Sequence, residues 1–245
     1  MNSFQLTDRT KEIIEDIKRI NALSYEDLSN EFQKAIDLSR KLGENGWTVD
    51  GSKTPNDIRE WLFKIESNGE EAIAQLFSEN EIENIFDRAE TRYNSLPEQG
   101  YIWRAIENYH AGRYTEAAMF LLGVIDSRIS QITPEKYRKK TKQCQEGLVE
   151  QGKVKFDDNS NCPAFRQLVI CYYIPSFSAF AERLFVDNEK YNLSNGIEPP
   201  YLNRNWLFHG RMCRRVKRFE CIQLIHSFAT LAEIEDWITE DTNNG

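Results

Sequence analysis

Three residues near the C-terminal end of the chain, Arg204, Asn205 and His209, have the types and spacing needed to cleave a phosphodiester. A histidine can donate or accept a proton near neutral pH, and an arginine is permanently charged and can bind phosphate oxygens through two parallel hydrogen bonds. An asparagine beside them can orient the imidazole or a phosphate oxygen. The pattern is short, so the same residues also fit a histidine packed in a core and an arginine on the surface.

The residues around this motif favour a functional site. Pro199 and Pro200 lie just upstream, five and four residues before Arg204, as is common ahead of a helix start, and Gly210 follows the histidine. The spacing predicts a helix over about 201–217 with Arg204 in its first turn, because residues five apart are about 140° apart on a regular helix and the long arginine must reach round it. Five basic residues come after the glycine, and they could hold flanking phosphates without identifying the bases. They are Arg211, Arg214, Arg215, Lys217 and Arg218.

Most of the chain shows apolar residues at helical spacing, and no segment shows the pattern of a strand. The sequence therefore predicts an all-α fold, with a bundle of packed helices in the C-terminal part. The helices that we expect lie over about 8–20, 25–42, 55–66, 69–78, 80–94, 101–132 with a turn at Gly112, 164–173, 175–187, 201–217 and 219–238.

The negative charge of the chain is concentrated in its first part. The net charge is -8, yet residues 1–98 carry 12 Lys and Arg against 21 Asp and Glu, whereas residues 99–245 carry 19 against 18. A break with Pro and Gly at 94–100 coincides with this change. We therefore predict an acidic α-helical domain over 1–98, whose role the sequence does not indicate, and a second helical domain over 99–245. A basic run at 136–142 is compatible with phosphate binding and equally with a solvated helix face.

Composition excludes several classes of protein. No run of eighteen apolar residues exists, so we expect no membrane span, and the first residues lack the basic flank and apolar core of a secretory signal. The five cysteines form no CxxC pair, and the three histidines have no paired ligand spacing. We therefore expect a cytoplasmic protein with no disulfide framework, no metal site and no cofactor.

The C-terminal part resembles the HEPN superfamily of helical proteins, particularly its Apea-like branch. Ribonucleases of that superfamily carry an arginine, four to six residues and then a histidine, often with a polar residue directly after the arginine. Arg204, Asn205 and His209 match this pattern. The segment 101–132 is similar to the first long helix of that fold, and the resemblance covers about 101–238.

The resemblance implies a metal-independent endoribonuclease. A histidine would take the proton from a ribose 2′-OH, Arg204 would stabilise the charge on the phosphorane, and a histidine would protonate the 5′ leaving oxygen. RNA would be cut and DNA would not, since the nucleophile belongs to the substrate. Asp126 falls where related proteins often keep an acid, which implies a contact with Arg204; an exposed helix charge is the alternative. The family further implies a homodimer with a composite active site, and a toxin, abortive-infection or phage-defence setting with an antitoxin or regulatory partner.

Two other functions stay open at this point. One is a HEPN dimer that binds a protein or nucleotide partner without cleaving RNA. The other is a helical adaptor whose acidic first domain contacts a basic partner. The combination of Arg204, Asn205 and His209 favours the ribonuclease, because a scaffold would not require it.

Overall fold

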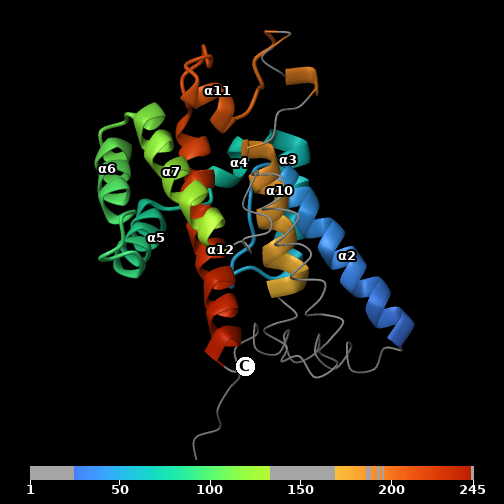
Figure 1. Cartoon of the computed structure of the whole chain (residues 1–245). Helices are drawn as coiled ribbons and strands as arrows, with labels where there is room; N and C mark the ends of the chain where they lie inside the picture. The colour runs from blue at the N-terminus through green and yellow to red at the C-terminus, as the bar shows by residue number, and fades with distance from the viewer. Residues whose placement is uncertain (1–24, 133–168, 186–188, 192–193, 195, 244–245) are drawn as a thin grey trace, which may run out of the picture.

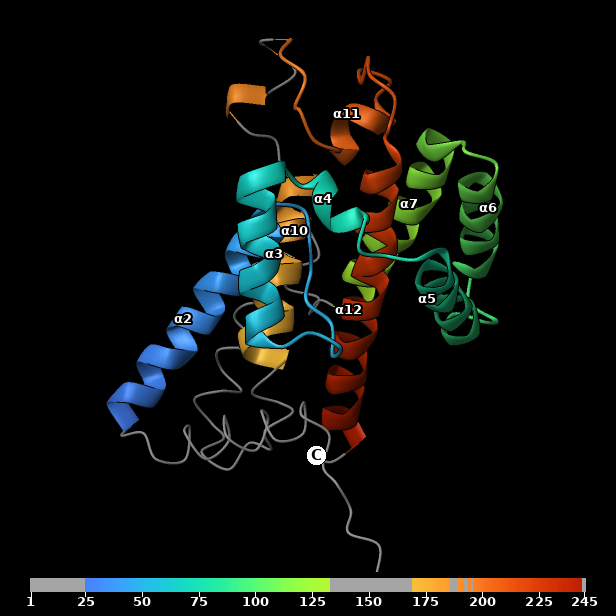
Figure 2. The same ribbon diagram turned by 180° about the vertical axis from the view of Figure 1, so that it is seen from behind.

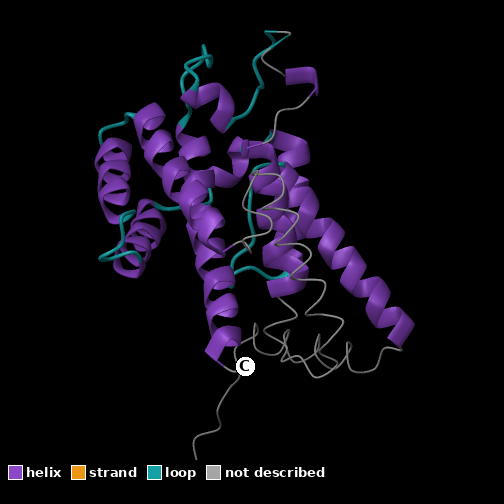
Figure 3. Ribbon diagram, in the orientation of Figure 1, coloured by secondary structure: helices purple, strands orange, loops and turns teal. Residues whose placement is uncertain are grey.

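The computed structural model describes residues 25–132, 169–185, 189–191, 194 and 196–243. These residues form helices, turns and loops, and none of them lies in a strand (Figure 3). The predicted all-α fold is therefore confirmed. The basic run at 136–142 and the helix expected over 8–20 lie outside the described residues.

The structure describes helices before and after residues 133–168, which lie outside the described residues. In chain order they are α2 (Tyr25–Glu44), α3 (Pro55–Asn68), α4 (Glu71–Ala74), α5 (Glu79–Arg92), α6 (Gln99–His110), α7 (Tyr114–Ile132), the π-helical turn η2 (Val169–Tyr173), α10 (Ile174–Phe185), the 3-10 turn η3 (Glu189–Tyr191), α11 (Arg204–Phe208) and α12 (Arg218–Asn243).

Most of the expected helices are present. Gly112 has a positive φ of 69° and forms the turn between α6 and α7, where the sequence predicts one. The helix expected over 69–78 is shorter, since only Glu71–Ala74 is helical, and of the one expected over 164–173 only a π-helical part is described. Expected helices that agree with the structure to within five residues at each end are those over 25–42, 55–66, 80–94, 175–187 and 219–238.

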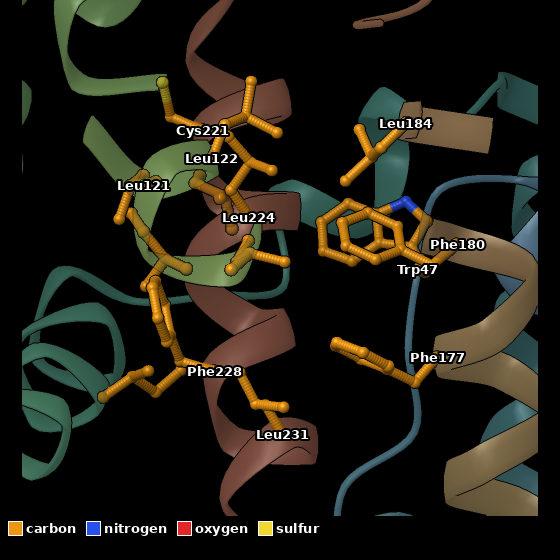
Figure 4. Packing of buried hydrophobic residues seen from close by; sticks show 14 of the residues in the cluster. Trp47, Leu121, Leu122, Phe177, Phe180, Leu184, Cys221, Leu224, Phe228 and Leu231 are labelled. Atoms are coloured by element: carbon orange, nitrogen blue, oxygen red, sulfur yellow. The ribbon is translucent and has the colours of Figure 1, made fainter. Parts of the chain in front are cut away.

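The long helix α12 passes between two groups of helices, with α5, α6 and α7 on one side and α2, α3 and α10 on the other (Figures 1 and 2). Leu121 and Leu122 of α7 lie against one face of α12, near Leu224 (Figure 4). Trp47, from the segment after α2, and Phe177 of α10 lie on the other side. The side chains on both sides are buried, so α12 is the element that joins the two groups into one core.

The expected break at 94–100 is a turn between α5 and α6, in which Ser95 has a positive φ of 68°. Buried side chains from both sides of this turn belong to the same hydrophobic cluster, which includes Trp47 and Ile82 as well as Phe177. The two predicted parts of the chain therefore share one core. That they have separate roles remains a prediction.

The prediction of a helix over 201–217 is wrong in its extent. Helix α11 covers only Arg204–Phe208, and His209 ends it. Gly210 has a φ of 64°, a backbone conformation that residues with a side chain rarely adopt. Its N–H donates to the carbonyl of Leu207 at 3.1 Å. The backbone turns out of the helix at this glycine, and 211–217 form a loop that leads into α12.

Candidate functional site

Helix α11 begins at Arg204 because Asn203 caps it. The Asn203 backbone is extended, and its buried side-chain carbonyl accepts from the backbone N–H groups of Asn205 at 3.0 Å and of Trp206 at 3.3 Å. Asparagine is among the preferred residues at this position, because its oxygen pairs with N–H groups that have no partner inside the helix. The prediction that Arg204 lies in the first turn is confirmed.

Three side chains fix α11 to the end of α10 and to η3. The amide nitrogen of Asn203 donates to the carbonyl of Arg183 at 3.2 Å, and that of Asn205 donates to the carbonyl of Phe185 at 3.2 Å. The indole N–H of Trp206 donates to the carbonyl of Tyr191 at 2.9 Å. Trp206 and Leu207 of the helix are also buried, whereas Phe208 and His209 are exposed.

The expected contact between Asp126 and Arg204 is present. A guanidinium nitrogen of Arg204 lies 3.3 Å from a carboxylate oxygen of Asp126, and each side chain is 36% exposed. The guanidinium also donates to the Asn205 side-chain oxygen at 3.4 Å and lies over the Phe208 ring, 5.2 Å from its centroid. Asp126 comes from α7, so the charged group of Arg204 is held between two elements while remaining accessible.

His209 lies at the other end of the short helix. Its backbone N–H donates to the carbonyl of Asn205 at 3.2 Å, and its side chain is exposed. Within the described part of the chain, the imidazole forms no hydrogen bond or ion pair. The backbones of Arg204 and His209 are thus about 7.5 Å apart along the helix axis. Both side chains are accessible, and the guanidinium extends toward Phe208, the residue before His209.

The five basic residues that follow the motif divide into two kinds. Arg214 is half-buried and donates two hydrogen bonds, at 2.7 and 2.6 Å, to the carboxylate of the buried Glu220. Arg218 pairs with Glu79 and lies over the ring of Tyr109. These two arginines bind carboxylates of the protein, so the structure assigns them contacts within the fold.

Three cations of the same loop are exposed. The side chains of Arg211 and Arg215 form no hydrogen bond or ion pair to any residue that the structure describes. The ammonium of Lys217 lies 5.6 Å from the centroid of the Phe219 ring. An RNA phosphate near α11 would meet these three charges rather than all five.

Sequence reasoning missed a group of polar residues in the core. His226 of α12 is fully buried, with Nδ1 3.2 Å from the Thr48 hydroxyl, which in turn accepts from Thr230 at 2.8 Å. Nε2 lies 3.2 Å from a carboxylate oxygen of Asp50, at ion-pair distance although outside linear hydrogen-bond geometry. Hydroxyl, imidazole and carboxylate follow the order used in nucleophilic catalysis, but Thr48 and His226 are 0% exposed, which makes the group structural.

The environment of Asp50 favours its ionised form. Burial by itself raises the pKa of this carboxyl, but the imidazole of His226, together with Ser52 and Lys53, outweighs burial and holds the pKa well below its ordinary value. No local sequence signal could have found this group, because Thr48 and His226 are 178 residues apart in the chain.

A second feature lies away from the motif. A groove of about 490 Å³ runs between α5 and α12, lined by side chains that include Arg92, Tyr93 and Glu233. None of the motif residues lines it. Burial and the nearby carboxylates of Asp236 and Asp50 raise the pKa of Glu233. The groove therefore belongs to a different face from α11.

Comparisons with family models, with curated proteins and with solved structures find no match for this chain. Among the described residues, no helix is both long and apolar enough to cross a membrane. No group of three His, Cys, Asp or Glu side chains in the same residues is arranged to hold a metal ion. The geometry around α11 is therefore the basis on which a function can be argued.

Proposed function

We propose that the protein is an endoribonuclease of the HEPN type, with Arg204, Asn205 and His209 in its active site. The observation that carries the proposal is that α11 is firmly anchored while its two reactive side chains remain accessible. Asn203, Asn205 and Trp206 anchor it to backbone carbonyls of the fold, while the imidazole of His209 and the guanidinium of Arg204, which lies over Phe208, remain accessible. Reactive groups on a rigidly held element meet the geometric requirement for catalysis.

The chemistry follows from these two groups. His209 removes the proton from a ribose 2′-OH, and the oxygen attacks the adjacent phosphorus. The bond from phosphorus to the 5′ oxygen then breaks, and this oxygen takes a proton from an imidazolium, so the products are a 2′,3′-cyclic phosphate and a 5′-OH. Arg204 stabilises the negative charge on the phosphorane, where a charged donor contributes most. Proton transfer by a positioned histidine accounts for about 10²–10⁴ of the acceleration.

Asp126 and Asn205 have supporting roles in this scheme. Both accept from the Arg204 guanidinium, at 3.4 Å for Asn205 and 3.3 Å for Asp126, which fixes its position while the side chain stays 36% exposed. An arginine has five N–H donors, so a phosphate can bind to those that face solvent while the Asp126 contact persists. The exposed Arg211 and Arg215, with Lys217, supply positive charge for the flanking phosphates.

The decisive experiment is incubation of the purified protein with total RNA in EDTA. We expect cleavage to persist and the products to carry 2′,3′-cyclic phosphate ends, because the histidine and the substrate hydroxyl supply every proton and the nucleophile. Strict dependence on magnesium, or products with 5′-phosphate ends, would exclude this mechanism.

One observation favours a second candidate, a HEPN module that binds RNA or a nucleotide without cleaving it. Arg204 already has a carboxylate partner in Asp126, which reduces its positive charge toward a phosphate. Binding that is retained when no RNA is cut, and that is lost in Arg204→Ala, would identify this function instead.

A further inference from the structure

Arg183, in the last turn of α10, binds two elements of the first part of the chain. Its guanidinium donates to both carboxylate oxygens of Glu70, at 2.8 and 2.7 Å, and also to the backbone carbonyl of Glu44 at 2.8 Å. Only 12% of the Arg183 side chain is exposed. A partly buried pair with two parallel hydrogen bonds is among the strong and geometrically specific polar contacts.

The same arginine holds the residues that lead into the motif. The ring of Tyr201 lies over its guanidinium, with the ring centroid 4.4 Å from Cζ. The backbone carbonyl of Arg183 accepts from the side chain of Asn203, the residue that caps α11. Tyr201 and Asn203 precede Arg204 by three residues and one residue, so both contacts act on the start of the active-site helix.

Glu70 is itself fixed. It occupies the N-terminal cap position of α4, and its backbone carbonyl accepts from the indole N–H of Trp47 at 3.1 Å. Trp47 is completely buried and packs against the rings of Trp61 and Phe77. The N-terminus of α4 lies beside the C-terminal end of α10 (Figure 2). The contacts thus run without a gap from the core to Glu70, to Arg183 and to the start of α11.

We infer that Glu70 and Arg183 are positioning residues that set the orientation of α11, an inference whose catalytic part rests on the proposed function. Through them the acidic first part of the chain holds the reactive groups in place, which gives that part a definite role. Neither residue touches the reacting atoms. The Arg183 guanidinium acts through the ring of Tyr201, and the backbone of the same residue acts through Asn203. A small displacement of a catalytic group is enough to cost rate.

Hydrogen exchange of the full chain tests the inference without depending on activity. The variants are Glu70→Gln, which keeps the shape but removes the charge, and Arg183→Lys, which keeps the charge but loses the paired donors. Glu182→Gln is the matched control, because Glu182 lies on the same helix and forms an exposed pair with Arg40, between α2 and α10. We call the paired Glu70 and Arg183 the clamp. We expect amide exchange over 201–209 to be about tenfold faster in both clamp variants, Glu70→Gln and Arg183→Lys, and unchanged in the control.

Two outcomes of that measurement overturn the inference. One is exchange over 201–209 equal to that of the wild type in both clamp variants. The other is an equal increase in all described helices, which would mean that the pair stabilises the whole fold rather than α11.

Activity supplies a second, separable readout. If the wild type cleaves RNA, kcat of Glu70→Gln should fall about tenfold with KM changed less than twofold, since RNA-contacting cations are untouched. A fall in kcat as large in Glu182→Gln would also overturn the inference. If the wild type cleaves no RNA, the proposed ribonuclease fails, and the exchange data still decide whether the clamp exists.

Discussion

His209 and Arg214 are both basic residues that lie five positions apart in the chain, yet the structure places them in different environments. The His209 side chain is exposed at the end of α11, whereas Arg214 is half-buried and paired with the buried Glu220. Exposure without a partner is compatible with a reactive group, and burial with a partner is typical of a structural one. The same criterion separates Arg215, which is exposed, from Arg214.

His209→Ala should greatly reduce RNA cleavage, because the imidazole transfers the protons of the reaction. The fold should stay intact, because the imidazole forms no hydrogen bond or ion pair with the residues that the structure describes. We expect a decrease in kcat of about 10³ with a change in Tm of less than about 2 °C. His110→Ala is the control, since His110 is about half exposed and pairs with Glu83 in a different part of the fold. Loss of the circular dichroism signal in His209→Ala would instead make the histidine a structural residue.

Arg214→Glu and Arg215→Glu should affect different properties, the first the stability of the fold and the second the binding of RNA. The first places a carboxylate beside the buried Glu220 and should lower the free energy of unfolding by about 3–5 kcal/mol. The second should leave stability unchanged, weaken RNA binding for all sequences, and reduce the slope of log K against log salt by about one phosphate contact. Urea unfolding and titrations at several salt concentrations measure the two effects. Equal stability losses in both variants would contradict the assignment.

At the scale of elements, the segment after α2 and the helix α12 are joined by the contact between Asp50 and His226. Asp50 is the member of this contact whose ionised form the fold favours, since its pKa in the folded protein is held well below its ordinary value. A depressed carboxyl pKa stabilises the fold at every pH above the unfolded value, about 3.9, and this stabilisation is lost as pH falls through the folded value. The contribution of the Asp50 carboxylate to stability should therefore decrease in acid.

Asp50→Asn should lower the free energy of unfolding by about 2 kcal/mol at pH 7, because a hydrogen-bonded charge is removed from a buried site. The difference between wild type and variant should narrow as pH falls below about 4. Urea unfolding at a series of pH values measures both. A constant difference from pH 7 down to pH 2 would mean that the ionisation of Asp50 does not contribute.

Helix α11 shows what the sequence could and could not predict about an element. Its start was predicted to within three residues, at about 201 instead of Arg204, from the two prolines upstream. Its early end was not predicted, although Gly210 is a common residue at a helix end. The pairing of Arg218 with Glu79 could not be found from local patterns, because 139 residues separate the two in the chain.

The whole molecule depends on contacts of this long-range kind. Helical periodicity predicted the all-α fold and most helix positions, because each amphipathic pattern depends on neighbouring residues alone. The joining of the two groups around α12 was not predicted, because the shift in charge at 94–100 suggested a boundary and no local pattern shows which helices share a core. Within the site, the contact of Asp126 with Arg204 was one of the two alternatives that the sequence left open, and it is present.

The proposed ribonuclease would act as a homodimer with a composite site, since one imidazole per site must otherwise act as both base and acid. Light scattering should give twice the mass of the chain, and mixing Arg204→Ala with His209→Ala protein should restore part of the activity as protomers exchange. Neither variant alone should cleave. A monomeric protein that cleaves RNA, or a mixture as inactive as its components, would rule out the shared site.

The packing of α2 against α10 and of the segment around Thr48 against α12 has a consequence for synthesis of the chain. Partners separated by 178 residues cannot meet until the later one has been made, which takes about 18 seconds at ~10 residues per second. Until then the apolar faces of the first helices have no core to enter, and α11 has no α4–α10 platform to hold it. A nascent chain on the ribosome would therefore hold no assembled α11 site until both α10 and α12 had been made.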